Sequence, residues 1–252
     1  MRKSAIFLFF VTFCLTILGL SAQGGIAVPP QTARTKVKTE EKQKTEDSKQ
    51  RPVAKSKVYL LHSDLLRKDA SHPDAQIVTG NVKFRHDSVY MYCDSACYYD
   101  KVSSFEAFGN VKMVQGDTLF LYGDRLYYDG LTQIAEMRCN VRMENRTTTL
   151  LTDSLNYDRV YNLGYFFDGG TLMDEQNVLT SEWGEYSPQT KQSVFNYNVK
   201  LVNPQFTLTS DTLRYNTASK IADIVGPSDI WSDANHIYSE KGTYNTVTGK
   251  AD

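Results

Sequence analysis

The chain is poor in the side chains that most often bind metals or act as nucleophiles. It contains four histidines and four cysteines, and no histidine stands at the spacing of a zinc site. It also lacks the Gly-x-x-x-x-Gly-Lys-[Ser/Thr] loop of nucleotide hydrolases and the Gly-x-Ser-x-Gly turn of serine esterases. A net charge of −1 gives no electrostatic reason to expect nucleic acid as a partner. We therefore expect no enzymatic activity, no metal and no cofactor.

Long apolar runs are absent beyond the N-terminus. Residues 1–22 have a basic start, an apolar run from Ala5 to Leu20 and then small residues, which is the pattern of a cleaved signal peptide. The run is shorter than the roughly 20 residues of a membrane-spanning helix, although an uncleaved anchor is the alternative. Residues 23–57 are rich in charge, so we expect a disordered linker. The sequence thus predicts one folded domain over residues 58–252.

An internal repeat of about 29 residues fills that domain. Its anchor is a tyrosine that recurs in register, followed each time by Asp, Asn or Ser. The six anchors are Tyr99, Tyr128, Tyr157, Tyr186, Tyr215 and Tyr244. At such fixed positions beside a turn, we expect the tyrosines to pack the boundary between repeats.

Two apolar columns keep the same register as the tyrosine anchor. Seven residues before it stand Tyr92, Leu121, Leu150, Leu179, Leu208 and Ile237, and nine residues after it stand Phe108, Met137, Phe166, Phe195 and Ile224. Within a unit, Leu121 and Leu126 differ in parity, so a flat strand could not point both inward. We therefore expect each strand to bend.

Between these columns lies an acidic column, four residues before the anchor: Ser95, Asp124, Asp153, Glu182, Asp211 and Glu240. If each unit adds two strands, equivalent carboxylates lie roughly 9.5 Å apart, which is too far for a catalytic pair that shares a proton. We expect these side chains to accept backbone hydrogen bonds at the bend.

The composition of the units predicts an all-β fold. Val, Tyr, Phe, Thr and Leu crowd them, whereas Gly, Asn, Asp and Pro recur about every ten residues. Two strands per repeat give about 12 to 14 antiparallel strands, arranged as a repetitive β-jelly-roll or folded-over sheet. Stacked units would align the apolar columns into a stripe along the molecule.

Two strings in the early units resemble a known family. Gly109–Lys112 reads Gly-Asn-Val-Lys, and Tyr122–Asp129 reads Tyr-Gly-Asp-Arg-Leu-Tyr-Tyr-Asp. Together with the repeat, they resemble the OstA/LptA-like family of lipopolysaccharide-transport proteins, from about Val58 to the end. The resemblance implies a β-jelly-roll in the periplasm, free or associated with the outer membrane, that holds lipid A acyl chains inside the roll. It also implies edge-to-edge joining with other jelly-roll transport proteins or head-to-tail with copies of itself.

These observations lead to one functional hypothesis, a non-enzymatic periplasmic protein that carries or bridges lipopolysaccharide through an apolar groove. The last unit stops where earlier units enter their second strand, so we expect either a longer parent chain or an edge that a partner extends. The alternatives are a structural β-repeat scaffold without a ligand and a membrane-anchored inner-membrane partner of the same pathway. The residues that we expect to line the groove are Leu121, Leu150, Leu179, Leu208, Ile237, Phe108, Met137, Phe166 and Phe195.

Overall fold

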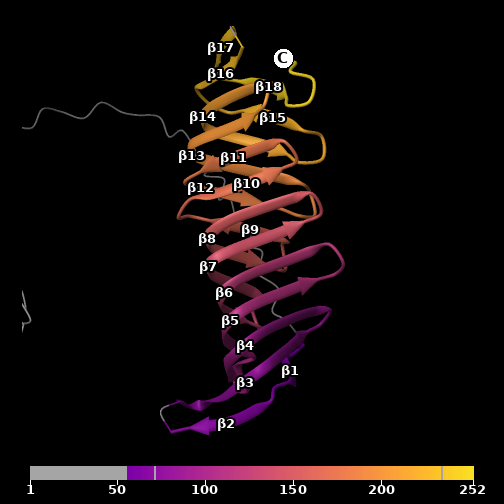
Figure 1. The fold of residues 1–252 in the computed structure, drawn as a ribbon, viewed down its shortest axis with the longest axis vertical. Helices are drawn as coiled ribbons and strands as arrows, with labels where there is room; N and C mark the ends of the chain where they lie inside the picture. The colour runs from indigo at the N-terminus through magenta and orange to yellow at the C-terminus, as the bar shows by residue number, and fades with distance from the viewer. Residues whose placement is uncertain (1–55, 71, 234) are drawn as a thin grey trace, which may run out of the picture. The chain divides into compact units, whose positions relative to one another are not determined.

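A computed structural model describes residues 56–70, 72–233 and 235–252, which form one compact unit. The predicted signal peptide (1–22) and nearly all of the predicted linker (23–57) lie outside these residues. Within the described residues the fold is a single antiparallel sheet of 18 strands with one short 3-10 turn, η1 (Asp100–Val102). Figure 1 shows the strands lying one above another, from β1 to β3 in indigo to β16 to β18 in yellow. The predicted all-β, folded-over architecture is confirmed.

The strands have the following bounds: β1 Tyr59–His62, β2 Leu65–Asp69, β3 His72–His86, β4 Val89–Tyr99, β5 Ser104–Gln115, β6 Leu119–Asp129, β7 Ile134–Asn145, β8 Thr148–Asp158, β9 Leu163–Phe166, β10 Gly170–Asp174, β11 Asn177–Ser181, β12 Trp183–Tyr186, β13 Gln192–Asn203, β14 Phe206–Asn216, β15 Ile221–Ile224, β16 Ser228–Ser232, β17 Asn235–Ser239 and β18 Gly242–Asn245. Eight of these, β3 to β8, β13 and β14, have 11 to 15 residues and run unbroken. The other ten form five consecutive pairs interrupted at the bend. The chain therefore traverses the sheet thirteen times, which is why 18 strands agree with the 12 to 14 expected from the repeat.

Every second long strand, β3, β5, β7 and β13, has two residues with positive φ at the bend near its middle. These pairs include Gly80 with Asn81 (φ 78° and 47°) and Gly109 with Asn110 (φ 74° and 45°), and the pairing register shifts at the same points. Glycine and asparagine tolerate this conformation better than other residues. The Gly-Asn-Val-Lys string therefore forms the bend in the middle of a strand.

The acidic column lies opposite these asparagines. Asn140 donates a side-chain hydrogen bond to Asp124 at 2.6 Å, and Asn110 donates one at 2.9 Å to Asp94, which stands one residue before the predicted Ser95. A backbone donor of the predicted kind is also present, because the Asn140 amide lies 3.3 Å from Asp153 Oδ1. The predicted backbone hydrogen bond is confirmed at Asp153, whereas at Asp94 and Asp124 the donor is an asparagine side chain.

The bend divides the sheet into two halves whose inner faces meet. On one half, residues directly opposite each other on successive strands form an unbroken apolar row, which we call the inner ladder, because directly paired residues share a face. Its members are Leu60, Phe84, Met91, Met113, Leu121, Met143, Leu150, Leu172, Leu179, Leu201, Leu208, Ile230 and Ile237. There is one member for each traverse, so the apolar interior runs from one end of the described stack to the other.

On the other half, tyrosines alternate with smaller residues or phenylalanine along the stack, so each ring has room on the inner face. This row, the tyrosine ladder, consists of Tyr98, Phe105, Tyr128, Ala135, Tyr157, Gly164, Tyr186, Ser193, Tyr215, Ala222 and Tyr244. All of its tyrosines are buried. Their rings are core, as the sequence indicates, but the first anchor is Tyr98 and not Tyr99.

Candidate functional site

Seven of the nine residues expected to line the groove lie together in the buried core of the roll. Each is at most 1% exposed, and all belong to one hydrophobic cluster. They are Leu121, Leu150, Leu179 and Leu208 from the inner ladder, and Met137, Phe166 and Phe195 from the other half. The two apolar columns of the repeat therefore do converge on one interior.

Phe108 is the exception, because it lies on the outer face. Its ring contacts the Arg125 guanidinium, 5.6 Å from the ring centroid, and neighbouring Ala107 takes the inward position at 1% exposure. The cause is one extra residue in the turn between β5 and β6. That turn has three residues, 116–118, whereas the equivalent turn between β7 and β8 has two. Inward positions before this turn therefore lie 30 residues, not 29, before their equivalents in the next unit. A constant spacing of 29 selects the residue next to the inward one, and that residue points to the opposite face of the strand.

Ile237 occupies the end of the inner ladder. It pairs with buried Ile230 and shares its face, yet it is 44% exposed, because no further described strand covers it. At the other end, Leu66 pairs with buried Val78 and is 49% exposed. The apolar interior thus reaches the surface at both ends of the described stack.

A row of polar contacts, which we call the seam, closes the roll on the side away from the bend. It begins at His86, whose Nδ1 lies 2.7 Å from the Tyr128 hydroxyl across the interior. Arg159 donates to the same hydroxyl and lies 3.1 Å from His86 Nδ1. Burial, and then the Arg159 guanidinium, lower the pKa of His86 from its ordinary 6.5. Burial raises the pKa of Tyr128 to about 12, although Arg159 opposes this shift.

The same arrangement recurs along the seam with different chemistry. In the next unit, Gln115 donates to Asn162 at 2.8 Å, and Tyr157 donates to the same oxygen at 3.2 Å. Further along, Tyr186 and Lys191 both donate to Asn145 Oδ1. Each contact links the end of an inner-ladder strand to the tyrosine ladder or to the turn that follows it.

An ion pair with a fully buried carboxylate forms another contact of the seam. Asp174 is 0% exposed, and its Oδ2 accepts from the Tyr215 hydroxyl at 2.7 Å and from Lys220 Nζ at 2.8 Å. Lys220 also lies 3.2 Å from Glu175 Oε1. Burial disfavours the ammonium, but the hydrogen bonds to both carboxylates outweigh it and raise the pKa of Lys220.

Sequence reasoning missed the seam, although a signal for it is present. Two residues after an inner-ladder residue stands a polar side chain, which a strand must point to the same inner face. These positions are His86, Gln115, Asn145, Asp174 and Asn203. The column repeats at 29 or 30 residues, so it could have been read as a polar border to the apolar interior.

The interior of the roll is apolar and its border is polar. Among the described residues, no group of three or more His, Cys, Asp or Glu side chains is placed to hold a metal ion. The inner ladder offers only aliphatic and aromatic contacts, and its polar border hydrogen-bonds to itself. Fold and site together define a β-roll with an apolar interior and a polar seam.

The family comparison assigns this roll to a known group of proteins. The model of the OstA-like protein family matches residues 55–211. The chain belongs to this OstA-like family, which confirms the relationship predicted from the repeat. No curated protein matches the chain.

A solved structure shows a partial likeness in fold. It is the crystal structure of LptH, the LptA-homologous periplasmic component of the lipopolysaccharide transport device of Pseudomonas aeruginosa. The two chains are 13% identical, the match covers 39% of this chain and 76% of LptH, and the TM-score is 0.37. These values carry no argument about function.

Proposed function

We propose that this protein is a non-enzymatic periplasmic component of lipopolysaccharide transport, which carries or bridges the lipid with its acyl chains inside the roll. The observation that supports the proposal most directly is the inner ladder, which is apolar at every one of its thirteen positions. Each methylene that leaves water there contributes about 0.8 kcal/mol. Membership of the OstA-like family supports lipopolysaccharide as the lipid.

Acyl chains reach this interior through the seam. The core side chains lie against one another in the closed roll, with Leu121, Leu150 and Leu179 at most 1% exposed. A guest chain must therefore separate the two half-sheets, and the seam is the side on which hydrogen bonds and not continuous strands join them. The phosphate-bearing head group would then remain outside, beside the polar border.

Bridging would use the unpaired strand edges. Within the described residues, β1 and β2 each pair only with β3, and β17 pairs only with β16. An edge strand presents free backbone donors and acceptors that another sheet can extend. We propose that such an edge joins another jelly-roll transport protein, or a second copy, so that the interiors become continuous towards the outer membrane.

A photocrosslinking experiment tests the binding of acyl chains. A leucine analogue carrying a diazirine is incorporated at Leu150, which lies on the inner ladder, and the protein is illuminated in the presence of lipopolysaccharide. We expect a covalent adduct that is absent when the same probe stands at Thr149, whose side chain points to the opposite face of β8. If the inner position gives no more adduct than the outer one, the proposed location of the lipid is wrong.

A structural β-repeat scaffold without a ligand is the second candidate, favoured by the closely filled interior. The two functions differ in one measurement, because a ligand that binds only the folded state must raise its stability. Lipopolysaccharide should therefore raise the Tm of a carrier and leave that of a scaffold unchanged. The membrane-anchored alternative depends on residues 1–20, which lie outside the described part of the chain; among the described residues, no helix is long and apolar enough to cross a membrane.

A further inference from the structure

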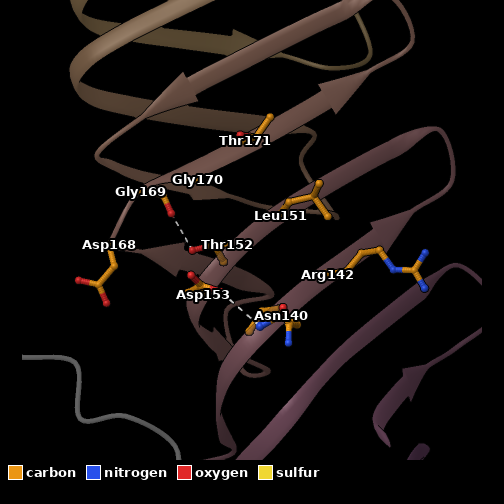
Figure 2. A pocket seen from close by; sticks show the side chains of 10 residues that line it. Asn140, Arg142, Leu151, Thr152, Asp153, Asp168, Gly169, Gly170 and Thr171 are labelled. Atoms are coloured by element: carbon orange, nitrogen blue, oxygen red, sulfur yellow. Dashed lines mark hydrogen bonds between the residues drawn. The ribbon is translucent and has the colours of Figure 1, made fainter.

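The outer surface carries a trough that the proposed lipid function does not use. It follows the bend and consists of consecutive hollows with shared walls, each about 400 to 540 Å³ in volume. The first and second hollows share Asn110, and the second and third share Asn140 and Arg142. Figure 2 shows the third hollow, where Asn140, Arg142 and Leu151 lie on one side and Gly169 and Gly170 on the other.

Aromatic rings and cations alternate along one wall of the trough. Directly paired residues on β3 to β8 give the order Lys83, Tyr92, Lys112, Tyr122, Arg142 and Leu151. Lys83 Nζ lies 5.4 Å from the centre of the Tyr92 ring, and the Arg142 guanidinium lies 4.4 Å from that of Tyr122. Tyr92 is 36% exposed, so part of its ring remains open to a ligand.

Amide and carboxylate groups line the floor beside these rings. Asp94 accepts from Asn110, and Asp124 accepts from Asn140, and each pair keeps further lone pairs and N–H groups for other partners. Rings flanked by fixed amides, carboxylates and cations offer an apolar face together with donors and acceptors. A sugar ring presents the matching surface, because one face is C–H and its edge carries hydroxyl groups.

The charges of the trough favour a sugar chain over nucleic acid as its ligand. The three hollows contain three cations, Lys83, Lys112 and Arg142, and four carboxylates, Asp94, Asp124, Asp153 and Asp168. A phosphodiester chain needs an excess of cations, since its affinity comes largely from their contacts with phosphates. A hydroxyl-rich chain needs both donors and acceptors, which this near balance supplies.

The spacing of the rings indicates an extended ligand. Tyr92 and Tyr122 lie on β4 and β6, two strands apart, which corresponds to roughly 9.5 Å. This distance is comparable to one disaccharide unit of an extended β-1,4-linked chain, whose rings repeat their orientation every second sugar. A chain lying across the strands would thus meet equivalent surroundings in successive hollows.

We propose that the outer trough binds an extended oligosaccharide of hydroxyl-bearing pyranose rings, with Tyr92 and Tyr122 stacking on the sugars and the bend residues bonding their hydroxyl groups. The site lies on the outer face, opposite to the inner ladder, so binding at this site can be tested independently of the lipid function. Two sources share this chemistry: the glycan strands of the cell wall and the sugar part of lipopolysaccharide.

Titration of the full chain tests the proposal, with chitohexaose representing β-1,4-linked glycan strands and a fully deacylated lipopolysaccharide representing the second source. We expect saturable binding of at least one probe, observed by calorimetry or by NMR shifts, and the probe that binds more tightly identifies the source. The double variant Tyr92→Ala with Tyr122→Ala should weaken that binding about tenfold or more, because aromatic contacts often dominate a binding surface. The binding should change little with salt concentration.

Matched variants separate recognition from folding. Tyr92→Phe with Tyr122→Phe keeps both rings and should retain most of the binding, whereas Thr180→Ala with Thr209→Ala alters the same outer row where it has no ring and should have no effect. Circular dichroism confirms that each variant is folded. Absence of binding by both probes overturns the proposal, as does equal binding by the alanine and parent proteins. Steeply salt-dependent binding of single-stranded DNA in place of sugar would also overturn it.

Discussion

Replacing Lys220 by methionine should destabilise the roll far more than the same change at Lys191. Both lysines close the seam, but Lys220 neutralises Asp174, whereas Lys191 contacts the neutral amide of Asn145. Without Lys220, a fully buried carboxylate retains only the Tyr215 hydroxyl, and its second oxygen already has no partner. Removing one member of a buried ion pair commonly costs about 3–5 kcal/mol.

The lower end of that range applies here, because the Lys220 side chain is 14% exposed and water can partly replace it. A loss of about 3 kcal/mol corresponds to a fall in Tm of about 6–12 °C for a domain of this size. The Lys191→Met variant leaves no charge unpaired, so its expected loss is about 1 kcal/mol or less. Urea and thermal unfolding, followed by circular dichroism, measure both changes under the same conditions.

A double variant shows whether the unpaired charge is the cause. Changing Asp174 to leucine as well as Lys220 to methionine removes both charges and should recover most of the lost stability, because apolar replacement of a buried pair is often nearly neutral. The reasoning is refuted if Lys220→Met and Lys191→Met cost the same, or if the double variant is less stable than Lys220→Met alone.

Three further predictions follow from particular contacts. Phe195→Ala should cost about 3–5 kcal/mol in urea unfolding, whereas Phe108→Ala on the outer face should cost about 1 kcal/mol or less; equal losses would contradict the assigned faces. Because burial, and then Arg159, lower the pKa of His86 below 6.5, the unfolded chain binds a proton that the folded chain does not. Stability should therefore fall as the pH drops through 6.5 towards the lowered pKa, and His86→Gln should flatten that part of a Tm-versus-pH curve. A methyl group at Gly184 would lie 2.6 Å from Phe166 Cζ, so Gly184→Ala should cost about 1–3 kcal/mol, and Phe166→Leu should restore part of it; no restoration would argue against this clash.

Much of the interior could be predicted from the repeat because strand periodicity fixes which side chains share a face. Leu121, Leu150, Leu179 and Leu208 follow a constant spacing, and the structure places all four on one ladder. The change of parity within each unit also predicts the bend correctly. These features depend on local sequence alone, which is why a single sequence reveals them.

The position of Phe108 could not be predicted from a fixed spacing, because the outcome depends on a turn eight residues later. The turn at 116–118 has one residue more than its equivalents, and every inward position before it shifts by one. The buried residues on the inner face are therefore Met91, Ala107 and Tyr98, whereas a constant spacing indicates Tyr92, Phe108 and Tyr99. Strict alternation of apolar residues along β4, with Val89, Met91 and Cys93 buried, was the signal for the shift.

The seam depends on distances along the chain that exceed one repeat. His86 and Tyr128 are 42 residues apart, and Asn145 with Tyr186 and Asp174 with Tyr215 are each 41 apart. Each of these three contacts therefore joins neighbouring units.

Neighbouring contacts of the seam share the turn after β8. Arg159 binds the Tyr128 hydroxyl and lies two residues after Tyr157, which belongs to the following contact of the seam. Separating His86 from Tyr128 would break at least one of the contacts of Arg159, which lies in the same turn as Asn162, the partner of Gln115. Opening at one unit would thus loosen the next one, and under the proposed function an acyl chain that entered at one place would lower the cost of its own advance along the inner ladder.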